Sequence, residues 1–246
     1  METSLNQILT RIPRSRYDRI RLNLEHRSAQ KTFERQRRVC RQPLEEAFPG
    51  LARIPAKMKC AVPTPAALGN MPAYELLLIS TLCAHRQPRL LLEFGTFDGL
   101  TALHLAMNSP TDARVVTIDL HPDDPIRQQN TEDTFYTQGV TVGGHFHDTA
   151  EAGKIEQIYS DTTAFDHGPY CKQVDFIFVD AGHAYELVRS DSQKALEMIR
   201  PGGVILWHDY HYTHDGVYSC LNELAASIPL RNVPDASLVY YICPND

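Results

Sequence analysis

The sequence predicts an α/β protein with a doubly wound, Rossmann-like, mostly parallel sheet, helices on both faces and a helical N-terminal extension. Three observations lead to this prediction. Short apolar runs recur after residue 88, helix-like segments separate some of them, and the first run leads into a glycine-containing turn. Such alternation is typical of parallel strands that are buried on both sides.

Residues 1–68 are predicted to form a basic helical extension and a linker. Apolar side chains among charges favour one or two helices over 1–47. Beyond them, Gly50 and the prolines at 55, 63 and 65 indicate irregular backbone.

The charge of the chain is uneven, because residues 1–60 contain 14 Lys or Arg against 6 Asp or Glu, whereas the remainder contains 10 against 24. The basic residues could attract an anionic substrate or nucleic acid. Alternatively they form a solvated helical face that docks on the protein's acidic body or on a second subunit. The second interpretation is favoured, because only Tyr17, Phe33 and Phe48 offer aromatic rings for base stacking before residue 60.

Residues 69–246 are predicted to form the α/β domain. A helix is expected from a cap at Asn70 to about His85. Strands are expected at 89–93, 114–119, 155–160, 174–180, 204–207 and 238–243, and further helices at 100–107 and 185–199.

Composition favours a soluble, cytoplasmic protein. A length of 246 residues with 43% hydrophobic content supports one large buried core. No apolar stretch approaches the roughly 20 residues needed to span a bilayer, and the N-terminus lacks the apolar segment of a secretory signal. The six cysteines include no C-x-x-C pair, which argues against a zinc site or a disulfide framework.

The segment 90–106, LLLEFGTFDGLTALHLA, is the most informative part of the chain. A buried strand leads into Glu93-x-Gly95-x-x-x-Gly99 and then into a helical pattern. The G-x-G-x-x-G spacing that binds a pyrophosphate is absent. Glu93 and Asp98 would repel phosphate but suit an ammonium group, which favours S-adenosylmethionine (SAM). The alternative is an ordinary glycine turn of an α/β protein.

Four acids end or follow predicted strands, namely Glu93, Asp119, Asp180 and Asp209. Ligands of open α/β sheets bind beyond the carboxyl ends of the strands, so each acid is a site candidate. Asp119 can accept hydrogen bonds from both hydroxyls of a ribose. The alternative for Asp119 is an exposed acid in a turn.

The loop after residue 93 resembles the first motif of class I methyltransferases, and the resemblance extends over roughly residues 70–243. It implies that Asp119 binds the ribose of SAM and that Asp161 binds the adenine amino group. The segment Ser-Asp-Thr at 160–162 is also a common helix cap, which is the alternative there. The cofactor-binding residues implied by the resemblance are Glu93, Gly95, Thr96, Phe97, Gly99, Thr101, Asp119, Leu120, Asp161 and Thr162.

Two further segments, VDFIFVDAGHAYE at 174–186 and PGGVILWHDY at 201–210, resemble the metal-assisted O-methyltransferases of macrolide-sugar, cephalosporin-pathway and catechol type. The resemblance implies a divalent cation, Mg²⁺, Mn²⁺ or Fe²⁺, held by Asp180, His208 and Asp209. The family usually has two acids or Asp-Asn at the last two positions, and an imidazole shifts preference towards softer ions such as Mn²⁺, Fe²⁺ or Zn²⁺. Alternatively, Asp180 orders a loop and His208 makes a hydrogen bond at the end of the sheet.

The resemblance also implies catalytic roles for Asp180 and His183. In the macrolide-sugar enzymes, the residue at the position of His183 takes the proton from the substrate hydroxyl, and histidine titrates near neutral pH. The alternative for His183 is a structural histidine at a helix start. His211 and His214 are expected to be surface residues.

The function implied is SAM-dependent methylation of a hydroxyl on a small molecule or sugar. One alternative is a nucleic-acid-associated methyltransferase or binding protein that uses the basic N-terminus. The Asn/Asp-Pro-Pro-Tyr/Phe motif of base-methylating enzymes, however, is replaced here by the sequence of residues 180–183. A hydroxylase-like relative on the same fold is a second alternative. No membrane partner is expected, and a homodimer is compatible with the appended helices.

Overall fold

The computed structural model describes residues 14–59, 69–128, 137 and 139–245. The chain divides into two compact units, Met1–Arg38 and Val39–Asp246. The sequence predicted a division after residue 68, whereas the described residues 39–59 belong to the second unit. The reason is that strand β1 (Cys40–Arg41) pairs with the sheet, and that Leu44 and Phe48 are buried in its core.

The first unit contains helix α2 (Arg14–Gln36), in agreement with the helix expected in this part of the chain. Within this unit, the Arg37 guanidinium lies 5.9 Å from the ring centre of Phe33 and 3.6 Å from Glu34. Residues 1–13 and the side chains of residues 14–24, which include five of the arginines, lie outside the described part.

The second unit contains an eight-stranded sheet in the order β1-β7-β8-β6-β5-β2-β3-β4. Strands β4, β3, β2, β5 and β6 run parallel, while β8 is antiparallel to β6 and β7. The chain moves outward from β2 to β4 and then returns to β5 on the other side of β2, so the order reverses between β2 and β5. The bounds are β2 (Leu90–Phe94), β3 (Arg114–Asp119), β4 (Ile155–Tyr159), β5 (Val174–Val179), β6 (Ile199–Trp207), β7 (Arg231–Asn232) and β8 (Val239–Ile242). The predicted doubly wound, mostly parallel sheet is confirmed.

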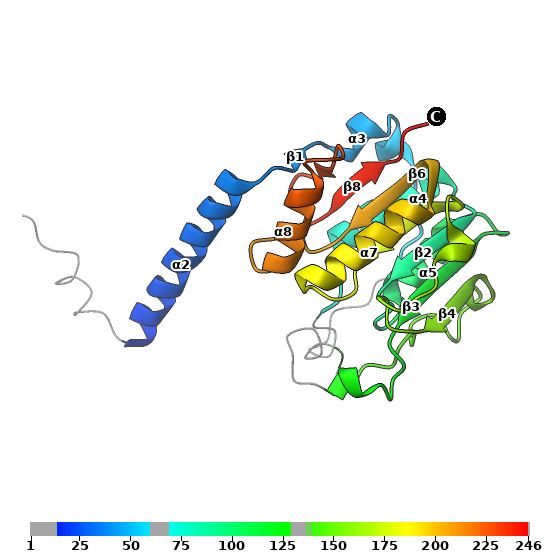
Figure 1. Ribbon diagram of the computed structural model, residues 1–246, viewed down its shortest axis with the longest axis horizontal. Helices are drawn as coiled ribbons and strands as arrows, with labels where there is room; N and C mark the ends of the chain where they lie inside the picture. Colours follow the sequence, from blue (N-terminus) through cyan, green and yellow to red (C-terminus); the bar gives the residue numbers. More distant parts are fainter. Residues whose placement is uncertain (1–13, 60–68, 129–136, 138, 246) are drawn as a thin grey trace, which may run out of the picture. The chain divides into compact units, whose positions relative to one another are not determined.

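Helices cover both faces of this sheet (Figure 1). Helix α4 packs beside α5 on one face, and α7 beside α8 on the other. Their bounds are α4 (Ala73–Arg86), α5 (Leu100–Asn108), α7 (Tyr185–Met198) and α8 (Asp215–Leu224), and a short helix α3 (Leu44–Ala47) follows β1. None of the described helices combines the length and apolar character that a membrane crossing requires.

Two predicted boundaries differ from the structure. Helix α4 starts after Pro72 without a side-chain cap, because the Asn70 amide instead donates a 2.7 Å hydrogen bond to Asp98. Strand β6 begins at Ile199 rather than at residue 204, because it passes through the Pro-Gly-Gly sequence and pairs with β5 across an irregular register.

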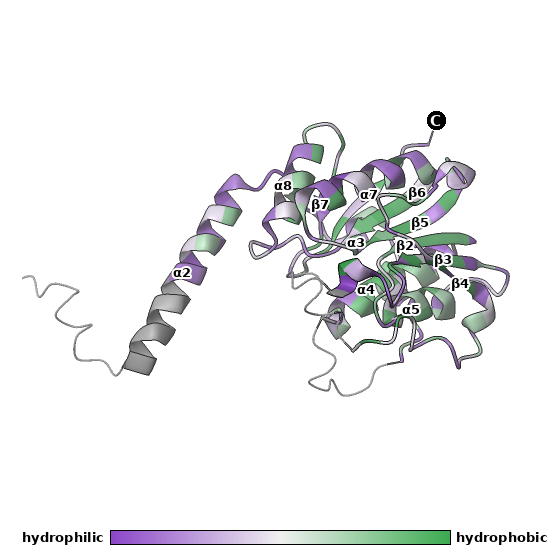
Figure 2. Ribbon diagram, turned by 60° about the horizontal axis from the view of Figure 1, so that its bottom comes forward, coloured by the Kyte–Doolittle hydropathy of each residue, from purple (hydrophilic) through white to green (hydrophobic). Residues whose placement is uncertain are grey.

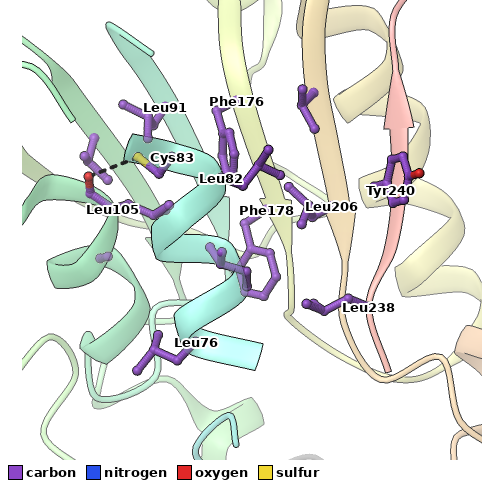
Figure 3. Packing of buried hydrophobic residues seen from close by; sticks show 14 of the residues in the cluster. Leu76, Leu82, Cys83, Leu91, Leu105, Phe176, Phe178, Leu206, Leu238 and Tyr240 are labelled. Atoms are coloured by element: carbon purple, nitrogen blue, oxygen red, sulfur yellow. Dashed lines mark hydrogen bonds between the residues drawn. The ribbon is translucent and has the colours of Figure 1, made fainter. Parts of the chain in front are cut away.

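The core lies between the sheet and helices α4 and α5 (Figure 3). Phe176 and Phe178 from β5 meet Leu82 of α4, and the Cys83 thiol donates a 3.5 Å hydrogen bond to the carbonyl of Leu105 on α5. Figure 2 shows the apolar residues concentrated on the strands, with polar residues on the outer helical surfaces. Because truncating a buried phenylalanine costs about 3–5 kcal/mol, this packing holds the strand ends firmly in register.

Candidate active site

The carboxyl ends of β6, β5, β2, β3 and β4 form one continuous edge, because backbone hydrogen bonds continue beyond the strands. The amides of His208, Asp180 and Gly95 donate to the carbonyls of Val179, Phe94 and Ile118, and that of Ser160 donates to Asp119, over 2.9–3.1 Å. The acids that follow these strands therefore line the crevice where the strand order reverses, which is where α/β sheets bind ligands.

The turn after β2 brings backbone unusually close to the next strand end. Gly95 has φ +92°, and a Cβ atom there would lie 2.1 Å from the carbonyl oxygen of Asp180. Phe97 also has a positive φ, +50°, and its amide donates a 2.8 Å hydrogen bond to Asp119. Gly99 has φ +84° and faces Phe146, so a side chain at this position would collide with the ring. The loop therefore requires glycine at both positions that the sequence singled out.

Glu93 lies at the floor of this turn and is fully buried. Its Oε2 accepts a 2.6 Å hydrogen bond from Thr117, whose hydroxyl also lies 2.7 Å from that of Thr96. For Glu93 Oε1, no partner is found among the described residues. Burial, together with the nearby carboxylates of Asp180 and Asp119, raises the pKa of Glu93 well above its usual value. An orphaned carboxyl oxygen in an acidic environment suits a ligand that carries positive charge.

Asp119 is held in place at the end of β3. Its Oδ2 accepts the amide of Phe97, and its Oδ1 accepts the amide of Leu120 over 2.7 Å. Arg127 donates to the same Oδ1 over 3.1 Å, and its side chain is 8% exposed. Burial raises the pKa of Asp119, although these donors oppose the shift. Asp119 therefore lies beside the turn after β2, and its predicted contact with a ribose stays a prediction.

The predicted adenine-side residues are arranged less directly. Oδ1 of Asp161 accepts hydrogen bonds from the amide and the hydroxyl of Thr163. The sequence offered a helix cap as the alternative here, whereas a turn and not a helix follows Asp161. The Thr162 hydroxyl donates over 3.2 Å to Asp191, a buried residue of α7. Thr101 lies in the first turn of α5. The structure therefore places residues 161 and 162 beyond β4 at the same edge, and gives Asp161 a structural role as well.

Three side chains converge where β5 and β6 end. Nδ1 of His208 lies 3.2 Å from Oδ1 of Asp180 and 3.4 Å from Oδ2 of Asp209. One potential ligand atom from each of these residues falls within 4.8 Å of the others. Asp209 adopts a left-handed backbone, φ +56°, which turns its side chain back towards the strand end at a cost of about 1–3 kcal/mol. Strain of this kind is common at functional sites.

His208 is linked on its other side to Glu75, from the first turn of α4. Its Nε2 lies 2.7 Å from Glu75 Oε2, and both residues are buried. Burial disfavours charge on His208, but Asp180, Asp209 and Glu75 outweigh it and raise the pKa of His208 well above its usual value. Burial likewise opposes ionisation of Glu75, but hydrogen bonds from His208 and Ser237 outweigh it and lower the pKa of Glu75. The pocket therefore stabilises a positive charge among three carboxylates.

This donor set fits a divalent cation. Two carboxylates and one imidazole nitrogen are the ligands that Mn²⁺, Fe²⁺ and Zn²⁺ accept, and metal-binding histidines usually donate their other N–H to a carboxylate, as His208 does to Glu75. The two alternatives for Asp180 and His208, loop ordering and a hydrogen bond at the sheet end, are compatible with the same contacts.

His183 lies beside the three converging side chains. Its Nε2 is 2.8 Å from Oδ2 of Asp209, and its ring stacks on that of His214 at a centroid distance of 4.4 Å. His214 lies 3.8 Å from Oδ1 of Asp209 and is mostly buried, so the expectation of a surface position was wrong for this residue. Burial opposes ionisation of Asp209, but hydrogen bonds from His183 and His208 outweigh it and hold the pKa of Asp209 below its usual value. A small recess at the ends of β5 and β6 is lined by His183, His208 and Asp209 and by Val188, Trp207 and Val217.

Comparison with known proteins identifies a family that part of this chain resembles. The model of a family described as a methyltransferase domain matches residues 92–210, which include β2, the glycine turn and the ends of β3 to β6. The matched segment is just under half of the chain, and the predicted resemblance to class I methyltransferases is confirmed over it. No match was found among the curated proteins.

Solved structures with the same fold include several methyltransferases. The O-methyltransferase TomG of Streptomyces achromogenes, involved in tomaymycin synthesis and solved in complex with SAM, is 20% identical at a TM-score of 0.52, over 71% of this chain and 82% of its own. An O-methyltransferase of Bacillus cereus in complex with SAH is 16% identical at a TM-score of 0.50, over 71% and 83%. A methyltransferase of Geobacter sulfurreducens is 16% identical at a TM-score of 0.51, over 72% and 80%. At these identities the likeness establishes the fold.

Sequence reasoning missed three residues of this region: Glu75, Arg127 and Asp191. Glu75 and Asp191 had a detectable signal, because each lies at helical spacing from apolar residues of its own helix and so falls on a buried face. Arg127 follows Asp119 in a polar segment with no periodicity. Only the folded backbone brings it back to that carboxylate.

Proposed function

We propose that this protein transfers the methyl group of SAM to a hydroxyl of a small molecule or sugar, with assistance from a divalent cation. The observation that carries the proposal is the convergence of Glu93, Asp119 and Asp180 on one crevice beside a glycine turn. SAM would supply a methyl group on a sulfonium that is already activated as a leaving group. The protein's part is then to hold two reactants in line, which contributes about 7–11 kcal/mol to lowering the barrier.

The cofactor half of the site is supported by the turn after β2 and by the end of β3. The carboxylate of Asp119 would accept the ribose hydroxyls, while the turn at Gly95 admits close backbone contact. The unpaired Oε1 of Glu93 would face the ammonium end of the cofactor. Residues Asp161 and Thr162 would border the adenine.

The acceptor half is supported by the ends of β5 and β6. Asp180, His208 and Asp209 would hold a cation, which supplies charge that favours deprotonation of a nearby hydroxyl. His183 lies next to Asp209, where it would accept the hydroxyl proton while Asp209 fixes its orientation. Positioned proton transfer contributes about 10²–10⁴-fold, less than positioning of the reactants.

Calorimetry with SAM and SAH tests the cofactor assignment, and nicotinamide dinucleotides serve as the negative comparison. SAM binding with no dinucleotide binding supports methyl transfer, and the reverse result would contradict it. The acceptor class is tested by screening hydroxyl compounds, including sugars, for SAH release with and without added divalent metal. SAH release with RNA instead of hydroxyl compounds, lost on deleting residues 1–60, would favour the nucleic-acid alternative.

A further inference from the structure

We propose that Glu75 is a positioning residue that fixes the tautomer of His208, so that the site formed with Asp180 and Asp209 takes a borderline divalent cation such as Co²⁺, Zn²⁺ or Fe²⁺ in preference to Mg²⁺. The inference rests on the metal-assisted function proposed above. Glu75 lies outside the segment that matches the methyltransferase family, so the family pattern does not include it.

Glu75 reaches the site because α4 runs against the direction of the strands. The C-terminus of α4 leads into β2 at one edge of the sheet, which leaves its first turn at the carboxyl edge, next to His208. Glu75 is 5% exposed. A buried carboxylate is retained only where it is fully hydrogen-bonded, and the contacts of Glu75 meet this condition.

Both oxygens of Glu75 are occupied. Oε1 accepts the backbone amide of Ser237 over 2.5 Å, and Oε2 accepts His208 Nε2 over 2.7 Å and the Ser237 hydroxyl over 3.2 Å. The backbone amide can only donate, so it fixes which way the carboxylate is oriented. An ionised carboxylate can only accept, so the proton of His208 is held on Nε2.

With a cation in the site and its proton on Nε2, His208 presents the lone pair of Nδ1 towards the position between Asp180 and Asp209. The separations of Nδ1 from the two carboxylate oxygens are 3.2 and 3.4 Å. Ligands bound at about 2.0–2.2 Å from one ion lie about 3 Å from each other, so this spacing is that of a coordination shell. Carboxylate, histidine and metal in this order form a recurrent arrangement in which the outer carboxylate sets the tautomer.

The nitrogen donor determines the metal preference. Mg²⁺ takes oxygen ligands and keeps several waters, whereas imidazole suits Zn²⁺, Fe²⁺ and Co²⁺. The histidine at position 208 therefore changes the preferred ion, and Glu75 makes that histidine a competent ligand.

The test is Glu75→Gln, with metal binding as the readout. The glutamine oxygen must stay on the Ser237 amide, so its NH₂ faces His208 and forces the proton from Nε2 to Nδ1, where it blocks the metal. Co²⁺ affinity, measured by calorimetry and by the visible absorption of bound Co²⁺, is expected to fall about 10–100-fold. The matched control is Glu156→Gln, which makes the same change on β4, where Glu156 pairs with Arg114. This variant is expected to leave Co²⁺ affinity unchanged.

A second variant, His208→Asn, removes the nitrogen ligand and is expected to lower the ratio of Co²⁺ to Mg²⁺ affinity about tenfold or more. If Co²⁺ binds Glu75→Gln as tightly as the original protein, the inference about Glu75 is wrong. If Co²⁺ binds His208→Asn as tightly, the nitrogen ligand through which Glu75 acts is contradicted, and this comparison remains available should Glu75→Gln fail to fold. If the original protein does not bind SAM, the proposed function is contradicted instead. SAM binding without any Co²⁺ binding contradicts the metal site and leaves methyl transfer standing.

Discussion

Gly95 is in backbone contact with Asp180: a Cβ atom on residue 95 would stand 2.1 Å from the Asp180 carbonyl oxygen and 2.9 Å from the Cα of Ala181. The contact joins the turn after β2 to the end of β5. Because the first borders the proposed cofactor position and the second carries a proposed metal ligand, displacement of one strand end displaces the other.

Gly95→Ala is therefore expected to destabilise the fold and to weaken SAM binding. The new methyl group meets backbone that cannot rotate away, and φ +92° is unfavourable for alanine, so a loss of about 1–3 kcal/mol or more is expected. Thermal unfolding and calorimetry with SAM measure the two effects. Gly153→Ala is the control, because nothing lies within 4 Å of a Cβ there. Equal behaviour of the two variants would contradict the contact.

The strands were predictable because burial on both faces makes them continuous apolar runs, as in LLLEF before the glycine turn. The strand-end acids were predictable for a geometric reason, since parallel strands share one carboxyl edge. The contacts among these acids were not predictable. A carboxylate such as that of Asp161 can accept hydrogen bonds within its own turn or bind a ligand, and the sequence does not decide between the two.

The Asp119 carboxylate gives a second prediction, because it is proposed to accept the ribose hydroxyls. Asp119→Asn replaces charge-assisted hydrogen bonds with weaker neutral ones, which are worth about 1.5–3 kcal/mol less in total. SAM affinity is expected to fall about 10–100-fold in calorimetry. Asp112→Asn, at an exposed pair with Arg89, serves as the control. An unchanged affinity for Asp119→Asn would remove the residue from the cofactor site.

His183 carries the third prediction, because it is proposed as the base and touches Asp209 rather than the turn after β2. His183→Ala is expected to lower kcat about 10²–10⁴-fold and to leave SAM affinity unchanged. His167→Ala, which removes a pair with Glu197 on the surface, is the matched histidine control. Loss of SAM binding in a folded His183→Ala variant would show that the assignment of roles is wrong.

Helix α7 illustrates why a buried acid is difficult to recognise from sequence. Asp191 lies three residues after Val188 and four before Ala195, both buried, so its position is on the inner face of the helix. Its partner is the Thr162 hydroxyl, which comes from the loop after β4 and is remote in sequence. Periodicity therefore shows that Asp191 is buried, but not that one of its oxygens lacks a partner among the described residues.

The fourth prediction concerns the dependence of stability on pH. Burial raises the pKa of Asp191 to about 7, although the Thr162 hydrogen bond and Lys194 oppose the shift. An unfolded chain has an Asp pKa of about 3.9, so between these two values the folded state binds more protons than the unfolded state. The contribution of Asp191 to stability is therefore full below about pH 4, falls as pH rises towards 7, and then stays low.

Asp191→Asn imitates the protonated carboxyl at every pH and removes this dependence. A gap of about three pH units corresponds to at most about 4 kcal/mol of unfolding free energy. The difference in unfolding free energy between the variant and the original protein is therefore expected to shift by up to this amount in favour of the variant from pH 4 to pH 8. Urea unfolding of both proteins across this range measures the gain. A difference in unfolding free energy that is the same at pH 4 and pH 8 would mean that Asp191 is ionised in the folded protein throughout, and that Lys194 and Thr162 outweigh its burial.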